Sequence, residues 1–236
     1  MQTYIEKDLP QLGLPVSPSE SRRILRMVSH IQGQLVNYAS LSKSLGVSSP
    51  SVKKYFHFLE HAFELTGGAD LNIEAVCSNH NDLYIFQRGN INSFHGVLVF
   101  DLAKIQEGKS LENTLISSFN LTLPELEGSA SGISDACFLV EKNLIIATAA
   151  VEQTLNTYDD GVVLGSFILV FSPDGKTLYT HLIQDTKGQT LPIKVEGITW
   201  LESTSDGEVF LLVTDSDGGD SEVLKVLLSN SIFANQ

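Results

Sequence analysis

The chain has 236 residues, of which 42% are hydrophobic and 18% charged, and its formal net charge is −13. This composition excludes a disordered chain, and no apolar run reaches the roughly 18 residues that a membrane-spanning helix needs. The N-terminus lacks a basic start followed by an apolar stretch, so we expect no signal peptide, no membrane partner and a cytoplasmic location.

The charge is divided unevenly along the chain. Residues 1–63 carry a net charge of +3, whereas the remainder carries −16. This asymmetry predicts two segments with different partners, a helical segment over 1–64 and a β-rich segment over 65–236. Two cysteines, Cys77 and Cys137, are too few for a disulfide scaffold, so we expect both to be reduced and buried.

The first segment has the pattern of helices joined by a tight turn. Apolar residues at helical spacing follow a capping stretch and predict a helix from about Ser19 to Gln32. A later helix is expected to end at Gly46, a Val-Ser-Ser turn follows, and Pro50 suits the first turn of the next helix. This spacing is typical of a helix-turn-helix.

A helix-turn-helix raises the question of DNA binding. The side chains available to a nucleic acid on the second helix are Ser49, Ser51, Lys53, Lys54 and His57. That helix has no Asn, Gln or Arg to read base edges, and a segment charge of +3 supports few phosphate contacts. We therefore favour a structural or protein-contacting helical bundle over a nucleic-acid partner.

Residues 3–64 resemble a known segment. The stretches TYIEKDLPQLG and RRILRMVSHIQGQLVNYASLSKSLGVSSPSVKKYFHFLEHAFEL are similar to the winged-helix-like segment of a large prokaryotic family of AAA-type ATPases, whose C-terminal domain has no known function. In that family a nucleotide-binding core precedes this segment. The present sequence has no GxxxxGK[ST] phosphate loop, so the resemblance does not imply ATPase activity, and it leaves open whether an ATPase core acts in trans.

The acidic segment contains about three repeats. Each has an acid at its start, a short apolar strand, a polar turn, a second strand rich in Ile, Val or Leu, and a third strand farther on. The acids are Glu74, Asp135 and Glu196, and each is 61 residues from the next. Such self-similarity predicts repeated small antiparallel sheets. The expected fold is mainly β with an N-terminal α-helical segment, a partial β-propeller of about three blades after a helix-turn-helix-like bundle.

The repeated acids suggest a metal site. The innermost strand of a propeller blade lies beside the central channel, where the oxygens of Glu74, Asp135 and Glu196 would suit Ca²⁺ or Mg²⁺. The alternative is that each carboxylate accepts hydrogen bonds from a neighbouring blade and binds no ion.

Further ligand candidates lie outside this set. Asp159, Asp160, Asp215 and Asp217 belong to acidic loops, for which we prefer a turn-forming role. Arg88 suits either an anionic ligand or an ion pair with a nearby acid, and we prefer the ion pair.

Residues 70–228 resemble the later blades of an uncharacterised bacterial family of β-propellers. The resemblance rests on RGN, on ISDACFL with ATAAVEQTLNTYDDGVVLGS, and on KVEGITWLE with LLVTDSDG and SEVLKVLL. A looser similarity reaches the calcium-binding six-bladed lactonases of the gluconolactonase type and the esterase-like phytases, and it implies that Glu74, Asp135 and Glu196 are metal ligands. Only about three blades are present, whereas a closed propeller needs at least four.

The sequence contains no arrangement typical of nucleophilic catalysis, since its serines lack a GxSxG elbow. We predict a non-catalytic binding or interaction module of unknown specificity. The first alternative is a Ca²⁺-dependent hydrolase formed when a homodimer closes a six-bladed ring, and the second is a DNA-binding regulator. Without ring closure, helices would cap a half-ring through residues such as Tyr55, Phe56, Phe58 and Phe63, and a protein partner is expected.

Overall fold

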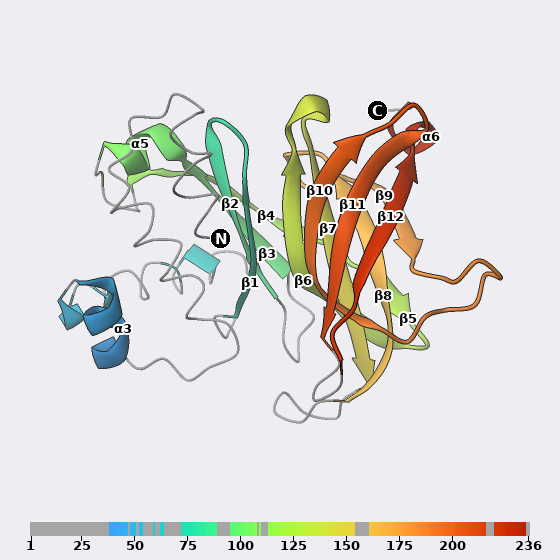
Figure 1. Cartoon of the computed structure of the whole chain (residues 1–236). Coiled ribbons are helices and arrows are strands. Elements are labelled where there is room, and N and C mark those ends of the chain that lie inside the picture. The colour runs from blue at the N-terminus through green and yellow to red at the C-terminus, as the bar shows by residue number, and fades with distance from the viewer. Residues whose placement is uncertain are drawn as a thin grey trace.

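The fold is mainly β with a few short helices, as Figure 1 shows. A computed structural model describes residues 38–46, 48–50, 52–53, 59, 62–63, 72–88, 95–107, 109, 113–153, 161–215 and 220–234. Among these residues the strands form three antiparallel sheets that follow one another along the chain. The mainly β class predicted from the repeats is confirmed.

The first sheet has four strands in the order β1-β2-β3-β4. They are β1 (Ile73–Ser78), β2 (Asp82–Gln87), β3 (His95–Asp101) and β4 (Leu115–Leu121). The short helix α5 (Leu102–Gln106) follows β3, and the Asp101 side chain caps it by accepting a hydrogen bond from the Lys104 amide.

The second sheet has five strands in the order β5-β6-β7-β8-β9. They are β5 (Glu125–Leu126), β6 (Ser129–Leu139), β7 (Leu144–Gln153), β8 (Val162–Phe171) and β9 (Thr177–Leu182). A 3₁₀ turn, η3 (Val140–Lys142), joins β6 to β7, and Asn143 follows it in the left-handed conformation.

The third sheet has three strands in the order β10-β11-β12. They are β10 (Lys194–Ser203), β11 (Gly207–Asp215) and β12 (Val223–Ser229), followed by helix α6 (Asn230–Phe233). In all three sheets the strands of the sequence repeats occur where they were expected, whereas β4 and β5 were not predicted.

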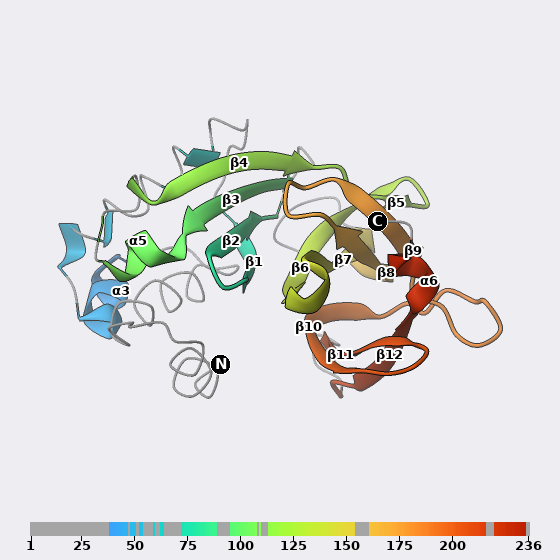
Figure 2. The ribbon, with the colours of Figure 1, turned by 90° about the horizontal axis from the view of Figure 1, so that it is seen from above.

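The sheets pack face to face in chain order. One face of the second sheet packs against the first sheet through Phe86, Ala147 and Leu169, and its other face packs against the third sheet through Ile146, Val170 and Phe210. Burial on both faces explains why β7 and β8 contain nearly continuous apolar runs. Strand β6 contacts both β1 and β10, and Figure 2 shows these three inner strands close together, with β4, β9 and β12 at the outer edges.

The described helical residues cover the first sheet. Helix α3 (Tyr38–Leu45) ends before Gly46, which has a φ of +63°, and residues 49–50, 52–53, 59 and 62–63 are also helical. Their apolar side chains share one buried cluster with the face of the first sheet that points away from the second. The cluster includes Leu41, Val52, Leu59, Ala62, Phe63, Ile73, Leu83, Ile85, Leu98 and Phe100.

Several expectations for the first segment fall outside the part of the chain that the structure describes. These are the predicted helix over 19–32 and the capping residues Tyr55, Phe56 and Phe58. Both cysteines are free thiols as predicted, Cys77 buried and Cys137 half-buried. No helix among the described residues is long and apolar enough to span a membrane.

Candidate functional site

Each inner strand contains a β-bulge in its pairing with the next strand of its sheet. In β1 the extra residue is Glu74, between Ile73 and Ala75 in the pairing with β2. In β10 it is Glu196, and in β6 it is Ser134. A bulge leaves one residue unpaired and re-aims its side chain, so three successive sheets present the bulged residue at an equivalent place.

This register corrects the alignment of the sequence repeats. The acid spacing aligned Asp135 with Glu74 and Glu196, but the structural equivalent of those two glutamates is Ser134. The Ser134 hydroxyl lies 2.9 Å from the Thr148 hydroxyl on β7. Asp135 points toward the third sheet instead, where its Oδ2 accepts a hydrogen bond of 2.8 Å from the Ile198 amide.

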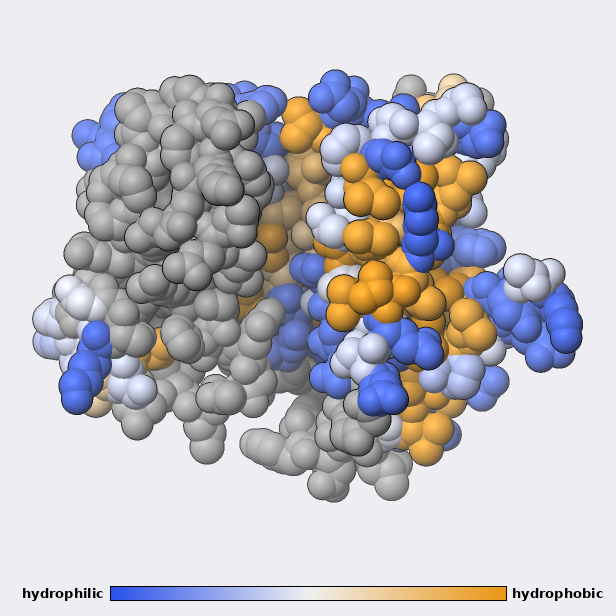
Figure 3. Space-filling model, viewed as in Figure 1, coloured by the Kyte–Doolittle hydropathy of each residue, from blue (hydrophilic) through white to orange (hydrophobic). Residues whose placement is uncertain are grey.

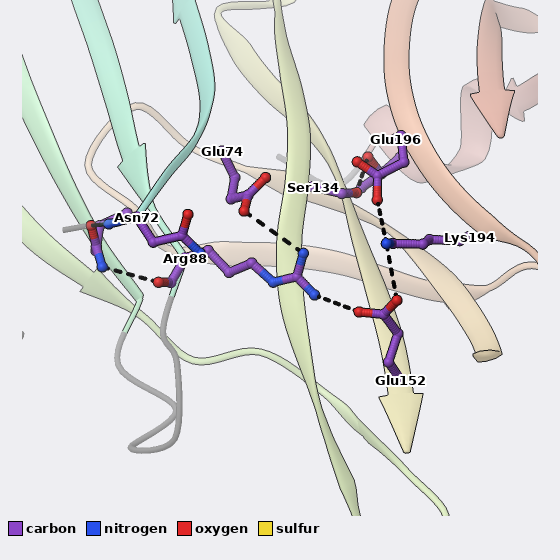
Figure 4. A network of polar contacts seen from close by, with 9 residues as sticks. Asn72, Glu74, Arg88, Ser134, Glu152, Lys194 and Glu196 are labelled. Atoms are coloured by element: carbon purple, nitrogen blue, oxygen red, sulfur yellow. Dashed lines mark hydrogen bonds and ion pairs between the residues drawn. The ribbon is translucent and has the colours of Figure 1, made fainter. Parts of the chain in front are cut away.

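A chain of ion pairs crosses all three sheets beside the bulges, as Figure 4 shows. An Arg88 nitrogen lies 3.9 Å from Glu74 Oε1, and the other donates a 3.1 Å hydrogen bond to Glu152 Oε2. Lys194 Nζ lies 3.0 Å from Glu152 Oε1 and 3.3 Å from Glu196 Oε1. We call Glu74, Arg88, Glu152, Lys194 and Glu196 the charged cluster. It contains three acids and two bases, from β1, β7 and β10 and from the residue after β2.

The positions of the two bases follow from the local backbone. Arg88 comes directly after β2, and its amide donates a 2.8 Å hydrogen bond to the Asn72 carbonyl. Its side chain passes over Gly132 of β6, where any Cβ atom would overlap the Arg88 side chain. Lys194 is the first residue of β10, two residues before the bulged Glu196. Because Gly132 has no side chain, Arg88 can reach across β6 from the first sheet to the second.

The interior around the charged cluster disfavours charge. Burial raises the pKa of Glu74, and the nearby Glu196 charge adds to this while Arg88 opposes it. Burial also raises the pKa of Asp135 to about 6, against the amide hydrogen bonds that it accepts. On β3, burial and the Arg88 charge lower the pKa of His95 to about 4, so this imidazole is neutral at pH 7. The ion pairs are the means by which charged groups are tolerated here.

One family model covers most of the chain. A family of unknown function, DUF6929, matches residues 27–228. The chain belongs to this family. Uncharacterised proteins of Mycobacterium bovis and Mycobacterium tuberculosis are each 37% identical to this DUF6929 chain over 60 residues, which is 25% of its length and 14% of theirs. The match thus covers a small part of the length of these curated relatives.

The carboxylates of the predicted metal site are engaged by protein groups in this DUF6929 chain. Among the described residues, no group of three or more His, Cys, Asp or Glu side chains is arranged to hold a metal ion. Glu74 lies beside Arg88, Glu196 lies beside Lys194, and Asp135 accepts the amide hydrogen bond from β10. The structure therefore does not arrange Glu74, Asp135 and Glu196 as a ligand set.

Arg88 forms the ion pair that the sequence favoured, and its partners are Glu74 and Glu152. Glu152 and Lys194 were missed because both lie at strand ends, outside the repeated acid motif. An alignment anchored on the β-branched residue before each bulge, Ile73, Ile133 and Val195, would have identified Ser134 as the equivalent of the two glutamates.

Of the candidates in the acidic loops, Asp215 is the partner of Lys194 in the register of β11 with β10. Asp215 ends β11 and is exposed, whereas Asp159, Asp160 and Asp217 lie outside the described residues.

Of the nucleic-acid candidates, Lys53 is helical and exposed, and the Ser49 hydroxyl lies 3.0 Å from the Ser42 hydroxyl. Ser51, Lys54 and His57 lie in positions that the structure does not describe.

Proposed function

We propose that this chain is a non-catalytic binding module, built as a partial β-propeller of three blades with a helical cover. Each of the three sheets would be one blade, and β1, β6 and β10 would be the strands nearest the propeller axis. The equivalent bulges in these strands support this assignment, since repeated blades carry repeated local geometry.

The observation that carries the non-catalytic proposal is the chain of ion pairs at the inner strands. In a metal-dependent propeller hydrolase the inner carboxylates would bind the ion that polarises the substrate. Here Arg88 and Lys194 lie between the glutamates and join blade to blade. This arrangement supports a structural role for these side chains, and the proposed binding function would then lie on the outer surfaces of the sheets.

We also infer that the N-terminal segment is related to the winged-helix-like segment of the AAA-type ATPase family and serves here as a cover for the first blade. The buried contacts of Val52, Leu59 and Phe63 with the first sheet support the covering role.

Hydrolase assays on the whole chain test the proposed function. Purified protein is incubated with a chromogenic ester, an aliphatic lactone and a phosphate monoester, with added Ca²⁺ and with chelator, beside the Glu196→Gln variant. We expect no turnover above buffer for either protein and no change of melting temperature with Ca²⁺. Calcium-dependent turnover that is lost in Glu196→Gln would establish the hydrolase and overturn the proposal.

A further inference from the structure

The layers of this molecule leave one sheet face without a cover among the described residues. The helical residues pack on the first sheet, the first sheet on the second, and the second on the third. Each of these contacts is a buried apolar cluster. The face of the third sheet that points away from the second contributes to none of the three clusters.

This outer face of the third sheet is apolar. In β11, Phe210 and Leu212 point into the cluster shared with the second sheet, so the alternate residues Leu211 and Val213 lie on the outer face. The strand register pairs Val213 with Val223 of β12. Val213 is 44% exposed, Val223 66% and Leu227 50%. Figure 3 shows hydrophobic side chains gathered over β10–β12 on the visible face.

The face also carries charged side chains, which include an ion pair and the exposed Asp215 at the end of β11. Lys225 of β12 donates a 2.9 Å hydrogen bond to Glu202 of β10, and these side chains are 59% and 51% exposed. A surface with adjacent opposite charges is complementary to a copy of itself turned by a two-fold axis, because each lysine then faces the glutamate of the other copy.

The cover on the first sheet decides which surface of a second copy fits. A head-to-tail ring would need the outer face of the first sheet, where Val52 and Leu59 are fully buried. Packing against that face would displace the helical residues that cover it. The outer face of the third sheet in a second copy is uncovered among the described residues, so packing against it displaces none of them. Apolar sheet faces pack face to face in sandwiches, and the sheets within this chain share buried apolar clusters.

We propose that a second copy of this chain packs against the outer face of the third sheet, face to face about a two-fold axis. This deepens the proposed function, on which it rests, by naming the partner of the binding module. Three short strands cover a footprint on the order of 400 Å². That is less than the roughly 800 Å² per partner of a standard interface. The dimer is therefore reversible, and its population rises with protein concentration.

Light scattering over a concentration series tests this dimer. We expect the mass to rise from 25.7 kDa toward twice that value in the wild type. Leu227→Glu and Val223→Glu should each stay monomeric with unchanged circular dichroism, because a buried unpaired charge opposes association. The matched control is Ile116→Glu on β4, where the isoleucine is 54% exposed, and it should dimerise like the wild type.

A mixing experiment tests the two-fold geometry. Lys225→Glu replaces the ion pair by two adjacent acids and Glu202→Lys replaces it by two adjacent bases, so each variant alone should associate more weakly than the wild type. Mixed in equal amounts, the two variants should form a heterodimer, because the two charges then face their opposites.

Three results would overturn the dimer proposal: a monomer at every concentration, an oligomer that survives Leu227→Glu, or a mixture of the charge variants that associates no better than each variant alone. Hydrolysis in the assays above would instead remove the proposed function, so the two failures are distinguishable.

Discussion

The outer faces of the first and third sheets are built from the same kinds of residue but have different surroundings. On the first sheet, Leu98 and Phe100 are fully buried under helical residues. On the third sheet, Val213 of the middle strand β11 and Val223 of the edge strand β12 are 44% and 66% exposed. The alternation of apolar residues in a strand therefore shows that a face is suited to burial, while the cover itself comes from elsewhere in the chain or from another molecule.

The largest expected difference between the two faces is in the free energy of unfolding that is lost when a side chain is truncated. Phe100→Ala should destabilise the protein by about 3–5 kcal/mol, because it leaves a cavity under the helical residues. Urea unfolding at low protein concentration measures this effect. Leu227→Ala on the third sheet is the control and should change stability by less than about 0.5 kcal/mol. Equal losses in the two variants would mean that the two faces are equally buried.

The ion pairs of the charged cluster link the three sheets, in addition to the apolar contacts between them. Arg88→Met should destabilise by about 2–4 kcal/mol, because Glu74 and Glu152 then lose their shared cation in a mostly buried site. Arg88→Lys, which keeps the charge without the two-pronged contact, should lose less. Chemical denaturation at pH 7 measures the stability of both variants. An Arg88→Met variant as stable as the wild type would show that these ion pairs do not stabilise the fold.

A smaller effect concerns the pH dependence of stability. Burial raises the pKa of Asp135 to about 6 from 3.8, so the folded protein holds this proton up to a higher pH than the unfolded chain does. The contribution of this carboxyl to the free energy of unfolding is fully present below about pH 4 and is lost as the pH rises through 6. His95 acts in the opposite direction, since its lowered pKa of about 4 makes stability rise with pH over a similar range.

The Asp135→Asn variant separates these two contributions. It removes the carboxyl and keeps His95, so its stability relative to the wild type should improve by about 2–3 kcal/mol between pH 4 and pH 7. Urea unfolding of both proteins across this range provides the measurement. A stability difference that is constant with pH would contradict the raised pKa of Asp135.

The smallest effect is expected on the uncovered face itself. Val223→Thr keeps the β-branched shape at a site that is 66% exposed, so the unfolding free energy of the monomer should change by less than about 0.5 kcal/mol. The same substitution should weaken the concentration-dependent association, as measured by light scattering. A large loss of monomer stability would show that Val223 is covered within its own chain.

Much of the fold could be predicted because it depends on local patterns. The alternating or continuous apolar runs around Ile85, Ile146 and Phe210 identified the strands, and polar turns such as Asn79–Asp82 separated them. Strand β4 was missed because its burial is low and its sequence, with Ser117, Ser118 and Asn120, lacks a strong apolar pattern.

The candidate site was predicted less well. A spacing of 61 residues selected Asp135, whereas the bulges are 60 and 62 residues apart and select Ser134. The carboxylates were expected to converge, but the cations between them come from Arg88 and Lys194, whose contacts depend on how three sheets pack. No pattern within one repeat contains that information, because each ion pair joins residues of different repeats.

The sequence by itself determined the β class, the three successive sets of strands, the free thiols and the preference of Arg88 for an ion pair, because these depend on periodicity, composition and the cost of isolated charge. Only the tertiary structure decided which residue occupies each bulge, which carboxylates share Arg88 and Lys194, and which of two similar apolar sheet faces is covered. Those outcomes depend on contacts between residues that are far apart in the chain, and a linear pattern does not record them.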